Sequence, residues 1–223
     1  MNHIFTPSTK GHFVHHIKKV ILAALVLFSS SQTLPMGTVA NIAAGLGSAV
    51  VFTIGHSTRT SAEFIDILRA YGITHIIDIR TIPRSRHNPQ FNEIELKKDL
   101  KQHHMLYTHM ASLGGLRHTK ADSINTGWHN ASFRGFADYM QTDDFQKGIE
   151  KLIEYAHHKK TVIMCAEAVP WRCHRSLIGD ALLVHGIHVM DIFSLTSAKP
   201  HTLTLWAVVN GTSITYPEAK EKS

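Results

Sequence analysis

Residues 161–186 carry the side chains whose types and spacing are best suited to chemistry. This segment contains both cysteines of the chain, Cys165 and Cys173. A cysteine near arginines at the start of a helix is pushed toward its thiolate form, because the helix dipole and the guanidinium charges favour the anion. Free backbone N–H groups at the same helix start bind oxyanions. We therefore predict a cysteine-bearing, oxyanion-binding loop between a buried strand and a helix.

The neighbours of the cysteines extend this prediction. Cations are unfavourable in the first turn of a helix unless an anion is present, and the forked donors of arginine match phosphate, sulfate or carboxylate. Glu167 lies close to Cys165 and is a candidate for moving protons. Cys165 could instead be a small buried side chain at a strand end. The ligand-binding candidates in this loop are Trp171, Arg172, His174 and Arg175.

Further candidates follow the other predicted strands, because ligands of open parallel sheets bind beyond the carboxyl ends of the strands. His56 follows the first strand and could act as a general acid or base, or be hydrogen-bonded scaffold. Arg80 could hold an anion or be paired with Asp78. A Gly-Gly pair allows a backbone to approach a ligand closely, although such a pair is more often only a turn. The ligand-binding candidates after the second and third strands are Arg80, Arg84, Arg86, Gly114 and Gly115.

These residues support three hypotheses. In the first, the chain is an enzyme in which a cysteine thiolate attacks phosphorus or sulfur, arginines hold the oxyanion, and Glu167 or His56 moves protons. In the second, the chain binds a nucleotide or nucleic acid without catalysis, using the arginine loop and the aromatic side chains of Trp128, Phe133 and Trp171. In the third, Cys165, Cys173 and His174 form a metal or redox site. The nearby arginines oppose a cation, so we expect neither a metal nor another cofactor. The expected partner is a small phosphorylated ligand, a nucleotide or a nucleic acid.

The elements that must position these residues alternate between strand and helix. Apolar runs predict buried strands, and apolar residues at helical spacing predict amphipathic helices. We predict an α/β fold: a three-layer, Rossmann-like domain with a mostly parallel sheet of about five strands and helices on both faces. The expected strands are 50–54, 75–79, 105–109, 161–164 and 188–192. The expected helices are 61–71, 93–103, 136–140, 145–157 and 176–185, with loops at 81–92 and 117–135.

Composition excludes several classes of protein. The apolar fraction of 43% and charged fraction of 18% are typical of a folded globular chain rather than a disordered one. Only two cysteines among 223 residues argue against a secreted disulfide scaffold. The formal charge of +6 suits phosphate-bearing ligands. The 18 histidines are unusual, and surface positions are the expectation for most of them.

The N-terminal region is predicted to be separate from the fold. Residues 1–19 contain lysines and no acid, and an apolar run at 20–28 is too short to span a bilayer. Residues 1–48 therefore have either the outline of a signal peptide or that of a start site placed too early. We expect the domain over 49–210, without stable membrane insertion, and a polar tail over 211–223. A cytoplasmic location is expected, or export if the signal peptide is genuine.

Six short motifs stand out along the chain: 53–57 (TIGHS), 78–80 (DIR), 83–86 (PRSR), 113–115 (LGG), 164–167 (MCAE) and 171–175 (WRCHR). On these motifs the chain resembles, over about residues 51–195, the DUF488 family, a domain of unknown function. The name implies no established reaction. Members usually begin close to the first strand, which favours the start-site explanation for residues 1–48. Rhodanese and cysteine phosphatase folds are a looser analogy, since they also pair an Asp-x-Arg strand end with a cysteine loop that cradles an anion.

Overall fold

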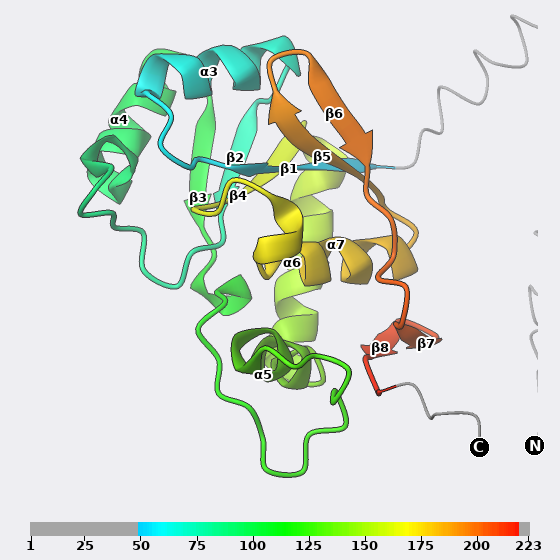
Figure 1. The fold of residues 1–223 in the computed structure, drawn as a ribbon. Coiled ribbons are helices and arrows are strands. Elements are labelled where there is room, and N and C mark those ends of the chain that lie inside the picture. Colours follow the sequence, from blue (N-terminus) through cyan, green and yellow to red (C-terminus); the bar gives the residue numbers. More distant parts are fainter. Residues whose placement is uncertain (1–48, 219–223) are drawn as a thin grey trace, which may run out of the picture. The chain divides into compact units, whose positions relative to one another are not determined.

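The computed structural model describes residues 49–218, so the predictions for residues 1–48 lie outside the described residues. Its main feature is a six-stranded sheet in the order β3-β2-β4-β1-β5-β6 (Figure 1). All neighbouring pairs are parallel except β5 and β6. The strands are β1 (Val50–Gly55), β2 (His75–Asp78), β3 (Leu106–His109), β4 (Thr161–Cys165), β5 (His188–Ser194) and β6 (Ser197–Pro200).

The prediction of a mostly parallel α/β sheet is confirmed, with one strand more than expected. The central strands are apolar runs because helices cover them on both faces. The strand missing from the prediction is β6, whose sequence SAKP has no apolar run and is half-buried or exposed. It is held at the sheet edge by antiparallel pairing with β5, which its own sequence does not indicate.

Helices cover both faces of the sheet (Figure 1). On one face, α3 (Ser61–Ala70) and α4 (Glu93–Gln102) pack Phe64 and Leu96 against strand residues such as Ile54. On the other face, three helices pack side chains such as Phe136 and Leu177 against Ile163. These three are α5 (Ala131–Tyr139), α6 (Asp143–His158) and α7 (Arg175–Val184). The predicted three-layer arrangement is confirmed.

Capping side chains set the starts of two helices. Thr60 caps α3: its side chain accepts from the Glu63 backbone N–H, and Glu63 lies at the third helical position of a full capping box. Helix α5 begins at Ala131, inside the predicted loop 117–135, because the Asn130 side chain caps its first N–H groups.

The C-terminal boundary of the domain also differs. A short hairpin of β7 (Val208–Asn210) and β8 (Ser213–Thr215) follows the main sheet. Ile214 and Tyr216 are buried, and the Tyr216 hydroxyl donates to Asp180 Oδ2 at 2.9 Å. The prediction therefore places the start of the polar tail too early, at residue 211. The domain continues at least to Tyr216. Among residues 49–218, no helix is long and apolar enough to cross a membrane.

Candidate functional site

The predicted cysteine loop connects β4 to α7. Strand β4 ends at the buried Cys165, and a short 3-10 helix, η3 (Pro170–Arg172), leads to Cys173 and α7. The loop crosses the end of β1 at Gly55, where a Cβ atom would lie 1.7 Å from the Glu167 carbonyl oxygen. Glycine is required there because the two backbones are in contact. The Ala166 carbonyl accepts from Ser57 N–H at 2.9 Å, which anchors the loop.

The loop brings both sulfurs and one imidazole together. His174 Nδ1 lies 4.0 Å from Cys165 Sγ and 3.7 Å from Cys173 Sγ. The other ring nitrogen, Nε2, lies 3.3 Å from the Ile79 carbonyl oxygen. Since a carbonyl can only accept, a neutral His174 ring carries its proton on Nε2 and presents a lone pair on Nδ1 to the two thiols.

The turn after β3 positions this imidazole. Another 3-10 helix, η2 (Ala111–Leu113), precedes Gly114 and Gly115. A Cβ atom on Gly115 would lie 2.4 Å from His174 Nδ1, so the missing side chain makes room for the ring. Gly114 instead packs against Thr81, where a Cβ would meet the backbone Cα at 2.8 Å. The Gly-Gly pair is therefore needed for packing at the site, and only Gly115 contacts a candidate functional side chain.

The two thiols have opposite acid–base properties. The neighbouring Cys173 thiol, together with burial, raises the pKa of Cys165 well above its usual range. The neighbouring Cys165 thiol lowers the pKa of Cys173, and the positive charge of Arg175 lowers it further against the effect of burial. Cys173 also directly precedes the N-terminus of α7, where the helix dipole favours an anion. Of the two sulfurs, Cys173 is the one stabilised as a thiolate.

Arg175 is buried and holds the loop rather than facing solvent. Its side chain is 1% exposed, and its guanidinium donates to the Glu167 carbonyl and, at 2.9 Å, to the Ala168 carbonyl. Its Nε has no hydrogen-bond partner, and no carboxylate pairs with it within residues 49–218. Arg175, which was predicted to bind a ligand, therefore donates its hydrogen bonds to the loop backbone. It lies inside the protein as a positive charge beside Cys173.

Arg80 and His56 form a second buried group at the ends of β1 and β2. Arg80 donates to both oxygens of Asp78, with Nη2 to Oδ2 at 2.6 Å, and to the Phe91 carbonyl at 2.8 Å. His56 stacks on Phe91 at 4.2 Å. Its Nδ1 donates to the Ser57 carbonyl at 2.8 Å, and its Nε2 accepts from Arg80 Nη1 at 3.4 Å. Both ring nitrogens are thus occupied, and burial lowers the pKa of His56 to about 4.

A pocket of about 400 Å³ opens above the sulfurs. Arg84 and Arg172 form its exposed positive walls, and Glu167 adds a carboxylate. The predicted site residues that line this pocket are Cys165, Cys173, Glu167, Arg80, Arg84, Gly115, Arg172 and His174.

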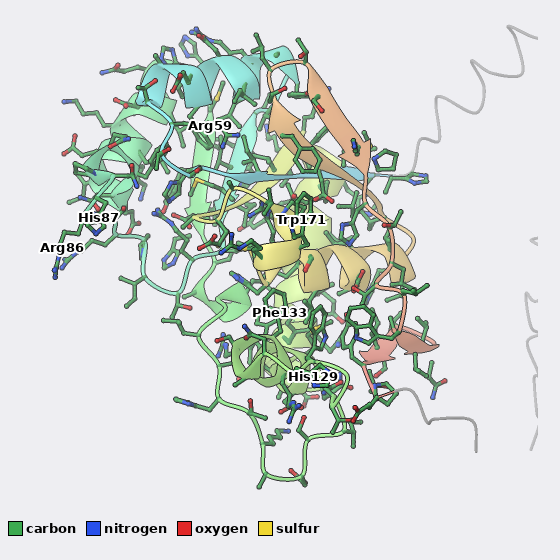
Figure 2. The ribbon with its side chains drawn as sticks, in the orientation of Figure 1. Arg59, Arg86, His87, His129, Phe133 and Trp171 are labelled. Carbon is green, nitrogen blue, oxygen red and sulfur yellow. The ribbon has the colours of Figure 1, made fainter. Side chains whose placement is uncertain are left out.

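The other predicted site residues lie outside the pocket lining. Three of them contact residues that do line it: His56 contacts Arg80, Gly114 packs against Thr81, and Arg175 donates to the Glu167 carbonyl. Arg86 is exposed and projects outward from its loop, beside His87 (Figure 2). Trp171 is 65% exposed, and its ring lies 6.0 Å from that of Phe193. Neither Arg86 nor Trp171 contributes to the pocket wall.

Five pocket residues were not predicted: Ile82 and Leu116, and also Thr81, Ser132 and Ala166. Ile82 and Leu116 form the apolar wall together with Phe133, which the nucleotide-binding hypothesis includes. Ile82 and Leu116 are 62% and 72% exposed. Large apolar side chains in otherwise polar loops are the sequence signal that could have identified them. Phe133 stacks on Trp128 with ring centroids 4.7 Å apart, a contact that follows from the start of α5 at Ala131.

Fold and site together define an α/β protein with a thiol–imidazole cluster beneath an arginine-walled pocket at the carboxyl edge of its sheet. The family model of DUF488, a domain of unknown function, matches residues 60–182. The chain belongs to the DUF488 family, as the sequence motifs indicated. No curated protein and no solved structure matches it.

Proposed function

We propose that the chain is an enzyme that binds a phosphate-type anion in this pocket and acts on it through the Cys173 thiolate, in phosphoryl or sulfur transfer. One observation carries the proposal: both sulfurs and the free lone pair of His174 Nδ1 meet at the floor of a pocket walled by arginines. A nucleophile, a base for its proton and donors for an oxyanion are the parts that such a reaction needs.

The roles of the residues follow from their positions. His174 takes the thiol proton of Cys173 through Nδ1, and Cys165 donates its S–H toward the resulting thiolate. The thiolate forms a bond to the phosphorus or sulfur atom of the ligand, and the bond from that atom to its leaving group breaks with its electron pair. We assign to Glu167, exposed at the pocket wall, the transfer of a proton to the leaving group, for which its carboxyl must be in the protonated form. Arg84 and Arg172 neutralise the oxyanion.

His56 and Arg175 are assigned positioning roles in this proposal. His56 is neutral, and both its ring nitrogens are hydrogen-bonded, so it orients Arg80 and does not exchange protons with a ligand. Arg175 keeps the loop carbonyls in place and supplies a buried positive charge close to Cys173.

The anion-binding part of the proposal is tested with a matched pair of exposed arginines. Arg172 lines the pocket, whereas Arg86 projects away from it. Thermal unfolding of chelator-treated protein is followed with phosphate, sulfate and nucleotides, with chloride at equal ionic strength as the control. The anions should stabilise the wild type and the Arg86→Ala variant, and this stabilisation should be lost in Arg172→Ala. Equal stabilisation of both variants would show that the pocket is not the anion site.

The thiolate part is tested by alkylation with iodoacetamide and by peptide mapping. Cys173 should react faster than an ordinary thiol at neutral pH, and the rate should fall in His174→Ala. If Cys173 reacts no faster than a free cysteine peptide, the nucleophile is assigned wrongly.

A second candidate function is binding of a nucleotide or nucleic acid without catalysis. It is favoured by the apolar residues that line the same pocket as the arginines, where Phe133 stacks on Trp128 and could receive a base. The Cys173→Ser variant separates the two functions: a binding module keeps its affinity for nucleotides after this change, whereas an enzyme that depends on Cys173 loses its turnover.

A further inference from the structure

The three donor atoms at the pocket floor have the spacing of a metal site. His174 Nδ1 lies 4.0 and 3.7 Å from the two sulfurs, and all three atoms lie within 4.8 Å of one another. Around a tetrahedral zinc ion, with Zn–S of about 2.3 Å and Zn–N of about 2.0–2.1 Å, neighbouring donors are roughly 3.5–3.8 Å apart. The 3.7 Å sulfur–nitrogen distance lies within this range and the 4.0 Å distance exceeds it by about 0.2 Å, so ligation by His174 requires only small side-chain movements.

The chemistry of the donors also suits a metal. Two thiolates and one imidazole are ligands that zinc and other soft divalent cations prefer. The imidazole is oriented as metal-binding imidazoles usually are, because Nε2 faces the Ile79 carbonyl at 3.3 Å and leaves Nδ1 as the free lone pair. Gly115 leaves room for the ring in this position, because a Cβ atom there would lie 2.4 Å from His174 Nδ1.

The surrounding arginines do not exclude a cation. Arg80 is neutralised by Asp78 at 2.6 Å, and Arg84 and Arg172 are exposed to solvent. The buried charge of Arg175 favours the thiolate form of Cys173, which is the form that a metal binds. Two coordinating thiolates bring two negative charges, which match those of a divalent ion. The remaining positive charge instead favours an anion at the fourth position of the metal, on the side that opens to the pocket.

We propose that Cys165, Cys173 and His174 bind one soft divalent cation such as Zn²⁺, with the fourth coordination position open to the arginine-walled pocket. Each cysteine binds as a thiolate and releases its proton to solvent. This goes beyond the proposed function, because a sulfur that coordinates the metal is not free to attack a ligand. Metal binding and thiolate chemistry therefore exclude each other, and Zn²⁺ inhibits any reaction that uses Cys173 as nucleophile.

Cobalt substitution tests the site without relying on activity. The reduced, chelator-treated full chain is titrated with Co²⁺, and absorption is recorded. About one equivalent should produce thiolate-to-cobalt charge-transfer bands and the strong visible bands of tetrahedral cobalt, and Zn²⁺ should remove both. The chain has 18 histidines, so surface binding needs a control. The exposed His157→Ala variant should keep the bands, whereas Cys165→Ser and His174→Ala should lose them. Thiolate bands absent from the wild type, or kept in both site variants, would overturn the proposal.

A measurement on the unaltered chain guards against variants that fold poorly. One equivalent of Zn²⁺ should protect the reactive Cys173 from iodoacetamide, and a chelator should restore its reactivity. Alkylation that Zn²⁺ does not slow counts against the metal site even if Cys173 is highly reactive in the chelator-treated protein. Conversely, protection by Zn²⁺ supports the metal site even if Arg172→Ala keeps its response to anions. The metal site and the proposed function can therefore be refuted independently of each other.

Discussion

Replacement of His201 by glutamine should change how the stability of the protein depends on pH. His201 lies after β6, and its side chain is 7% exposed. Its Nδ1 lies 2.9 Å from Asp191 Oδ2, and its Nε2 lies 3.1 Å from Asp180 Oδ1. Burial by itself would lower the pKa of His201, but the hydrogen bonds and charges of the two aspartates outweigh it and raise the pKa to about 9. Tyr216, which donates to Asp180, has a pKa raised well above its usual range and stays neutral.

The size and direction of the effect follow from the two pKa values. The pKa rises from 6.5 in the unfolded chain to about 9 in the folded one. A shift of about 2.5 units at about 1.4 kcal/mol per unit corresponds to roughly 3 kcal/mol of folding free energy. Because the folded pKa is the higher of the two, this stability is fully present below pH 6.5 and is lost as the pH rises through about 9.

Urea denaturation at about pH 6 and about pH 10 measures this contribution. The difference in unfolding free energy between wild type and His201→Gln should be about 3 kcal/mol larger at the lower pH. Comparison with the wild type removes the contribution of other groups that titrate in this range. His188 is exposed at the start of β5, so His188→Gln should follow the wild-type profile. If the difference in unfolding free energy between wild type and His201→Gln does not vary with pH, His201 is not charged between its two aspartates and the reasoning is wrong.

Three other substitutions have defined outcomes. Gly115→Ala places a Cβ 2.4 Å from His174 Nδ1, which should cost about 1–3 kcal/mol in urea unfolding and weaken the cobalt bands. Asp78→Asn breaks the buried ion pair with Arg80 and should cost about 3–5 kcal/mol; a loss under about 1 kcal/mol would contradict the pairing. Thr60→Ala removes the cap of α3 and should cost about 1 kcal/mol in the same assay, with ligand responses unchanged.

Much of the fold was predictable because the signals are local. Five apolar runs were long enough to identify the five parallel strands, and alternation with amphipathic helices indicated the layers. The exceptions are elements whose stability comes from partners distant in sequence. Strand β6 pairs with β5 without an apolar run of its own. Likewise, Tyr216 is buried because Asp180 and Asn125 bind it, not because its neighbours predict a strand.

The candidate site divides in the same way. The sequence by itself determined the family, the parallel sheet and the edge at which Cys165, Cys173 and His174 collect, because parallel strands deliver their carboxyl ends to one side. Only the tertiary structure decided what each side chain does there. Arg175 and Arg86 are both arginines in predicted site loops, yet one is buried on backbone carbonyls and the other faces solvent.

The physical reason is that burial and hydrogen-bond partners are properties of the packed molecule. Whether an arginine recognises a ligand depends on which donors remain after the loop has folded over it, and whether a histidine is charged depends on carboxylates from other elements. His201 illustrates this most directly. Surface positions were the expectation for most histidines, but His201 is buried between two aspartates, one from α7 and one from β5.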